Sequence, residues 1–296
     1  MAQDTTEEYQ KYYVPEQSVW PIVGAVALFL IAVGAANFTV EVVREKPGFG
    51  GYVLLAGFVM LFVMVFGWFK NQIDESMSGL YSAQLGRSYR QGMLWFIFSE
   101  VMFFAAFFGA LFYARTIAVP WLGGASNNAM TNEVLWPTFE AMWPLTVTPG
   151  GTETQVMSWL GLPLYNTAIL LVSSVTLHYA HVGIEENKRG QLKLMLGLTI
   201  LLGCIFLGLQ GYEYVHAYRD LGLTLQSGVY GNTFFLLTGF HGLHVTLGTI
   251  FLFVLFLRVM KGHFTADEHF AFQAGAWYWH FVDVVWVMLF VVVYII

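Results

Sequence analysis

The sequence predicts an all-α membrane protein with seven transmembrane helices, and two observations carry this prediction. First, the chain of 296 residues is 57% hydrophobic and only 11% charged, whereas soluble domains carry about 25% charged residues. Second, the apolar residues gather into seven runs, each long enough to cross a hydrocarbon core of about 30 Å as a helix. Irregular backbone facing lipid would leave polar groups unsatisfied, so we expect helices in all seven.

The longest connection between the seven spans is the third loop at about 116–163, which is nearly free of positive charge. The expected spans are residues 20–40, 51–69, 93–115, 164–184, 192–215, 230–258 and 272–296. Nine of the thirteen Lys and Arg residues fall on the side that holds the N-terminus. Because positive charge favours the inner side, we expect a cytoplasmic N-terminus and an outer C-terminus.

Composition also excludes some function classes. The net charge of −6 argues against a nucleic-acid partner. The single cysteine, Cys204, supplies neither an internal disulfide nor a cysteine metal site.

The third span carries one carboxylate, Glu100, in the stretch LWFIFSEVMFFAAFFGALFYA at 94–114. An acidic side chain near the bilayer centre costs about 2.5–3.5 kcal/mol, so a partner must hold it there. Glu100 is therefore the first candidate for a functional residue. The alternative is a hydrogen bond that only joins two helices.

In each of two acid–histidine pairs, the acid and the histidine lie three positions apart in the sequence. Glu213 and His216, in GYEYVH, form one Glu-x-x-His element. A di-iron bundle needs two such elements and further glutamates. A structural pair at a helix end is therefore favoured over a di-iron site. His280 and Asp283, in WYWHFVDVVW, could relay a proton or clamp two helices, and the clamp is favoured.

Two histidine pairs share the same spacing. His241 and His244 lie in GFHGLH, and His178 and His181 lie in LHYAH. Two imidazoles on one helix face could bind haem iron or copper. They could equally form hydrogen bonds within the bundle.

Several stretches, taken in order, resemble subunit III of the haem–copper cytochrome c oxidases. They are RQGMLWFIFSEVMFF, PLYNTAIL, GVYGNTFFLLTGFHGLHVTLGT and HFTADEHFAFQAGAWYWHFVDVVW. GFHGLH followed by WYWHFVDVVW at this spacing is the most specific feature. Quinol-oxidase relatives generally lack the first two spans, so seven spans favour the cytochrome c class.

The resemblance implies one polytopic domain, 1–296, with two parts. A two-helix part, 1–69, would be separated by a V-shaped lipid cleft from a five-helix part, 70–296. The chain would be non-catalytic and bind no metal, because haem and copper reside in partner subunits. Ordered phospholipid would fill the cleft. These implications lower the expectation that the histidine pairs ligate a metal.

The implied complex reduces oxygen to water and pumps protons. This chain would pack directly against subunit I, with subunit II in the same complex and cytochrome c as electron donor. It would support proton uptake into subunit I and stabilise the redox core. The expected location is the bacterial cell membrane, in preference to the mitochondrial inner membrane.

Individual residues match the family pattern or depart from it. Glu100 matches a carboxylate that reacts with carbodiimide in its protonated form, and Trp68 and Arg258 match positions implied to contact phospholipid. Arg258 could instead be only part of the inner positive charge. Tyr81, in GLYSAQ, stands where the family commonly has a lipid-binding His, and Gln273 stands where it usually has Glu.

A rival hypothesis is a stand-alone proton-coupled transporter or channel that uses Glu100, Glu213 and Asp283. A third is an enzyme that binds haem by itself. The proteins that co-purify with the chain would separate these possibilities.

Overall fold

The computed structural model describes residue 13 and residues 16–296, and this part of the chain is helical apart from loops and one isolated bridge. Within this described part, seven helices are long and apolar enough to cross a membrane, as the sequence predicts. The long helices are α1 (Trp20–Val43), α2 (Gly50–Met77), α3 (Ala83–Tyr113), α6 (Leu162–Glu185), α7 (Arg189–Arg219), α8 (Val229–Met260) and α9 (Phe270–Leu289). π-Helical turns continue α3 over Ala114–Ala118 and α9 over Phe290–Ile295.

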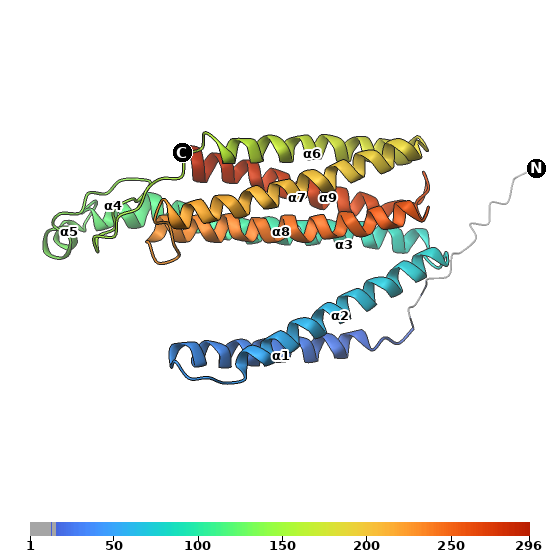
Figure 1. The fold of residues 1–296 in the computed structure, drawn as a ribbon, viewed down its shortest axis with the longest axis horizontal. Helices are drawn as coiled ribbons and strands as arrows, with labels where there is room; N and C mark the ends of the chain where they lie inside the picture. Colours follow the sequence, from blue (N-terminus) through green and yellow to red (C-terminus); the bar gives the residue numbers. More distant parts are fainter. Residues whose placement is uncertain (1–12, 14–15) are drawn as a thin grey trace, which may run out of the picture. The chain divides into compact units, whose positions relative to one another are not determined.

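The chain divides into two compact units, residues 1–89 and 90–296. In the first unit, α1 and α2 pack against each other (Figure 1). Glycine makes this close approach possible, because a Cβ added at Gly34 would lie 2.3 Å from the backbone nitrogen of Leu54. Tyr81 and Tyr89 complete the unit with tilted rings whose centroids lie 5.3 Å apart.

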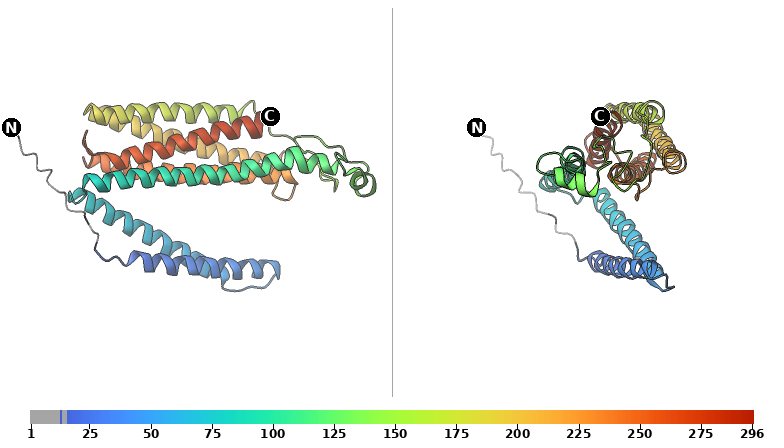
Figure 2. Two further views of the ribbon diagram at one scale, coloured as in Figure 1. Left: turned by 180° about the vertical axis from the view of Figure 1, so that it is seen from behind. Right: turned by 90° about the vertical axis from the view of Figure 1, so that its left-hand side faces the viewer.

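In the second unit, α6, α7, α8 and α9 form a closed ring of neighbours, as the end-on view in Figure 2 shows. The core includes Trp279 and Trp286 of α9, both fully buried. A buried indole needs a partner for its N–H. Trp279 donates to the Ser173 hydroxyl at 2.9 Å and Trp286 donates to the Thr167 hydroxyl at 3.0 Å, so two hydroxyls of α6 hold α9 in register.

The long loop between α3 and α6 contains two short helices, α4 (Val119–Leu122) and α5 (Ala129–Leu135). It is anchored to the end of the second unit by two hydrogen bonds. The Gln155 amide donates to the Leu221 carbonyl at 3.0 Å, and the Met157 amide donates to the Tyr230 hydroxyl at 3.3 Å. The loop is therefore an ordered cap on the helix ends.

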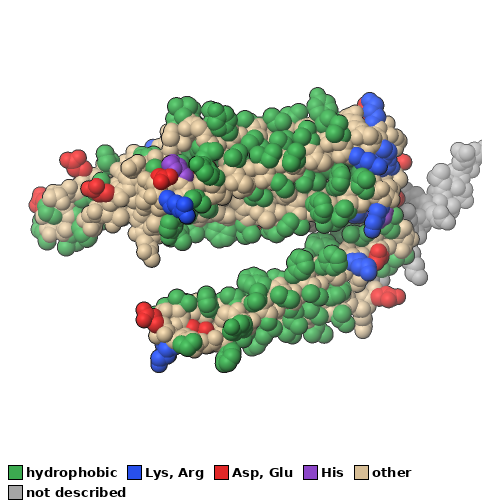
Figure 3. All heavy atoms as spheres, in the orientation of Figure 1, with side chains coloured by type: hydrophobic (Ala, Val, Ile, Leu, Met, Phe, Trp, Pro, Cys, Tyr) green, Lys and Arg blue, Asp and Glu red, His purple; other side chains and the backbone are tan. Residues whose placement is uncertain are grey.

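Apolar side chains cover the flanks of the long helices in each unit (Figure 3). Such a surface would be costly in water but is the ordinary surface of a helix in lipid. Apolar side chains therefore do not distinguish the outer face of a helix from its buried face, and the packing of neighbouring helices decides which face is buried.

Candidate functional site

Glu100 pairs with His244, and this contact joins α3 to α8. The Glu100 Oε2 atom lies 2.8 Å from His244 Nε2, and the two side chains are only 21% and 10% exposed. The other imidazole nitrogen, Nδ1, lies 2.6 Å from the Phe240 carbonyl oxygen, one helical turn earlier in α8. Helical periodicity supplies this second contact, because residues four apart share a face.

The contacts of His244 determine how many protons the pair holds. A carbonyl oxygen only accepts, so Nδ1 carries a hydrogen and donates it to Phe240. One further proton must then lie between Nε2 and Glu100, on the imidazole or on the carboxyl. Either arrangement has zero net charge, and a neutral pair costs far less to bury than a lone carboxylate.

Aromatic rings surround the pair. The Phe104 and Phe103 ring centroids lie 5.0 Å and 5.9 Å from that of His244. Tyr278 of α9 stacks at 6.4 Å with an interplanar angle of 25°. Phe103 and Phe104 of α3 thus give the His244 imidazole an apolar setting, which strengthens its hydrogen bond to Glu100.

A second polar cluster joins α6 to α9. Both His280 and Asp283 contact the Ser174 hydroxyl, with His280 Nδ1 at 2.9 Å. A hydroxyl that donates to the Asp283 carboxylate can still accept a hydrogen from His280. The three side chains line a hollow of about 310 Å³ with Leu171, Val284, Val287 and Met288. Sequence reasoning missed Ser174, although the adjacent serines in LVSSVT are an available signal.

The remaining acid–histidine and histidine pairs have separate partners. Glu213, fully buried, accepts from the Tyr294 hydroxyl at 2.7 Å. His216 instead contacts the Asp220 carboxylate at 2.6 Å, on the exposed side of α7. His241 lies at 3.2 Å from the Val282 carbonyl oxygen, so it shares no hydrogen-bonding partner with His244.

His178 and His181, the other histidine pair, also have different neighbours. His178 packs beside Tyr179, with ring centroids 5.9 Å apart. His181 turns toward Glu185, with 3.8 Å between Nε2 and Oε1.

The three expected lipid-binding residues lie in different surroundings. Trp68 is half exposed on α2 and stacks on Phe69 at 5.7 Å. The Arg258 guanidinium lies 4.5 Å from the centroid of the Phe264 ring. The Tyr81 hydroxyl lies within 3.2 Å of oxygens of Gln72 and Glu75. Burial raises the pKa of Tyr81 above its ordinary value, and the neighbouring Tyr89 and Glu75 raise it further.

The whole chain resembles one family of known proteins. The family model described as cytochrome c oxidase subunit III matches residues 10–296. Cytochrome c oxidase subunit 3 of Gadus morhua is 40% identical over 291 residues, covering 98% of each chain. The proteins of that name from Oncorhynchus mykiss and Hippopotamus amphibius are 40% and 38% identical, covering 96% and 98% of each chain. The chain therefore belongs to the cytochrome c oxidase subunit III family.

Proposed function

We propose that this chain is a non-redox, non-catalytic subunit of a proton-pumping cytochrome c oxidase. In this proposal subunit I packs directly against it, subunit II belongs to the same complex, and cytochrome c delivers the electrons. Haem and copper reside in the partner subunits. The curated relatives are named as oxidase subunits, which supports the complex.

One observation carries the non-redox part of the proposal. His244 belongs to one of the two histidine pairs considered as ligands of haem iron or copper, and both of its ring nitrogens already have partners. Ligation through Nε2 would remove the hydrogen bond between His244 and Glu100, and the Ser99 hydroxyl at 3.5 Å from Oε1 would remain as a weak contact of that carboxyl. His244 is therefore better suited to neutralise Glu100 than to bind a cofactor.

Support of proton uptake into subunit I is the proposed contribution of Glu100. The pair holds one exchangeable proton between its two members and has no net charge in either arrangement. It can therefore stabilise the helices beside a partner without adding a fixed charge to the membrane. Trp68, Arg258 and Tyr81 are the proposed phospholipid contacts, of which Arg258 offers the cationic group that a phosphate requires.

The location proposed for the complex is the bacterial cell membrane. The N-terminus would be cytoplasmic, because nine of the thirteen cationic side chains then lie inside. Protease digestion of a tag at each end, in sealed inverted vesicles, would test this orientation: the N-terminal tag should be cleaved and the C-terminal tag protected.

The experiment that tests the function compares the oxidase complex with and without this chain. We expect oxygen reduction by the depleted complex to begin normally and then to decay over successive turnovers, with slower proton uptake. Adding the chain back should restore both. Unchanged activity and unchanged proton uptake in the depleted complex would contradict the supporting role.

The transporter hypothesis gains no specific support. Glu100, Glu213 and Asp283 contact His244, Tyr294 and Ser174 respectively. Each acid thus has its own local partner. If the chain transported a solute alone, purified chain in vesicles would carry it without oxidase subunits.

A further inference from the structure

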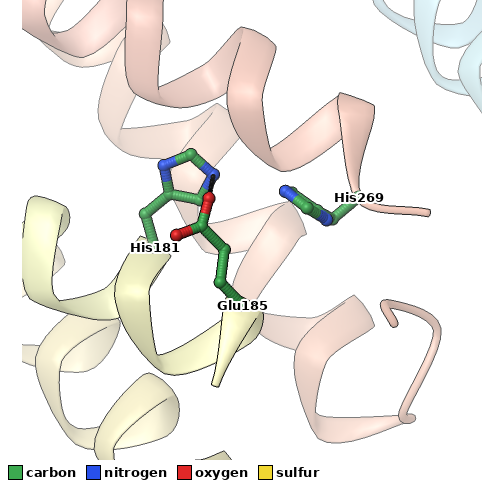
Figure 4. Close-up of side chains that lie close together, drawn as sticks. All are labelled: His181, Glu185 and His269. Atoms are coloured by element: carbon green, nitrogen blue, oxygen red, sulfur yellow. Dashed lines mark ion pairs between the residues drawn. The ribbon is translucent and has the colours of Figure 1, made fainter. Parts of the chain in front are cut away.

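A cluster of two imidazoles and one carboxylate lies where the end of α6 meets the start of α9. His181 and Glu185 come from the last turn of α6, and His269 immediately precedes α9 (Figure 4). One potential ligand atom from each residue lies within 4.8 Å of the other two. We propose that these three residues bind a divalent transition-metal ion, with Zn²⁺ as the ion to test first.

His269 is the residue that distinguishes this cluster from an ordinary surface pair. The residue is 8% exposed, and its Nδ1 atom lies 3.1 Å from the Thr265 carbonyl oxygen. Nδ1 must donate to that carbonyl, so Nε2 has a free lone pair in the neutral ring. This Nε2 is buried and has no hydrogen-bond partner among the residues that the structure describes. A backbone carbonyl that orients the ring and sets its tautomer is the usual arrangement behind a metal-binding histidine.

His181 presents a similar atom. Its Nε2 is also buried, with no hydrogen-bond partner in the described part of the chain, and lies 3.8 Å from Glu185 Oε1. The His181 and His269 rings meet edge to face, with centroids 5.3 Å apart. Two buried ring nitrogens thus lie in the same region without hydrogen-bond partners among the described residues, and a cation that both imidazoles ligate would satisfy them.

The geometry needs only a small adjustment to bind the ion. Ligands of tetrahedral zinc, at bond lengths of about 2.0–2.1 Å, lie about 3.4 Å from one another. The three ligand atoms lie within 4.8 Å of one another, so they must approach by at most about 1.4 Å. Glu185 already lies 3.8 Å from His181, and its exposed side chain can turn toward an ion, whereas the two imidazoles must supply the rest of the approach. Its exposure also provides an entry path and room for a water as fourth ligand.

The donor set selects the class of ion. Imidazole nitrogen suits zinc, copper, iron and nickel, whereas magnesium and calcium prefer oxygen ligands throughout. The nearby cation Lys188 already pairs with Glu186 at 2.6 Å, so its charge is balanced locally. The inference concerns a site distinct from Glu100 and does not depend on the proposed support of proton uptake.

The test measures ZnCl₂ binding to the full-length chain in lipid nanodiscs after treatment with a chelator. We expect saturable binding of one ion per chain, and a zinc absorption edge with nitrogen and oxygen ligands. His269→Gln, His181→Asn and Glu185→Gln should each weaken binding by more than about tenfold, as loss of metal-site residues does. Glu185→Gln is the variant least able to disturb folding, because that side chain is exposed.

Two matched controls keep the test specific. His216→Asn removes a histidine from another exposed pair four residues apart, and Glu186→Gln removes a carboxylate next to the cluster. Both should leave zinc affinity within about twofold of the unmodified chain, since neither residue is a proposed ligand. The proposal is overturned if the chain shows no saturable zinc binding, if the three variants bind as tightly as the unmodified chain, or if the controls lose affinity equally.

Discussion

Replacing Glu100 with alanine should destabilise the chain through its effect on His244. The substitution removes the group at 2.8 Å from Nε2 while the aromatic rings around the imidazole stay in place. His244 then has a buried nitrogen with no counterpart on α3. Glu100→Gln should be milder, because its amide can still donate a hydrogen to Nε2.

The contact geometry sets the expected size of the effect. Hydrogen bonds to charged groups contribute about 1.5–3 kcal/mol in proteins generally. Measured couplings between membrane helices average about 0.6 kcal/mol and reach about 1.7 kcal/mol. The short distance and low exposure place this pair near the upper end of the membrane range. We expect Glu100→Ala to cost about 1–2 kcal/mol and Glu100→Gln less than about 1 kcal/mol.

A double-mutant cycle with His244→Ala measures the contact directly. The free energy of unfolding would be measured in lipid bicelles with increasing detergent denaturant, for both single variants and the double variant. We expect a coupling of about 1–1.7 kcal/mol. The matched control is a cycle with His241→Ala, since His241 lies on the same helix but contacts Val282. A coupling to His244 below about 0.3 kcal/mol would refute the reasoning.

Three further substitutions test other contacts by the same unfolding measurement. Gly34→Ala should cost about 1–3 kcal/mol, because the new methyl group would meet the backbone of α2. Gly109→Ala is the control and should cost little, because a Cβ there meets no atom of the described residues within 4 Å. Equal effects of the two substitutions would contradict the packing argument. Ser174→Ala should cost about 1–3 kcal/mol, because it removes the hydroxyl shared by the acid–histidine pair of α9; an unchanged stability would show that the bridge is dispensable. Tyr294→Phe should cost a similar amount by leaving buried Glu213 without its donor, and no loss would mean that another group replaces the phenol.

The spans could be predicted from apolarity, but their ends could not. The second helix continues from the expected end at 69 to Met77, and the third begins at Ala83 where 93 was expected. These extensions are polar, in keeping with helix that continues beyond the hydrocarbon core. Hydropathy indicates how many residues of a segment lie within the hydrocarbon core, whereas a helix ends where its backbone hydrogen bonds end.

The candidate residues could be named from the sequence, but most of their partners could not. Spacing suggested that Glu213 would pair with His216, yet the first contacts Tyr294 and the second Asp220. The reason is geometric: residues three apart differ by about 60° around a helix, so one can face the bundle while the other faces outward. The contact between His269 and His181 could not be predicted, because no local spacing connects the two residues in the sequence.

The sequence by itself determined that this chain is a seven-span membrane protein and that a few ionisable groups are buried in it. Both follow from composition along the chain, because each apolar run must meet lipid or protein and each enclosed charge must find a partner. Only the tertiary structure decided which partner each group has. Glu100 meets His244, and Asp283 meets Ser174, through the rotation and depth of packed helices. Those are properties of side-chain packing between distant segments, which no local pattern specifies.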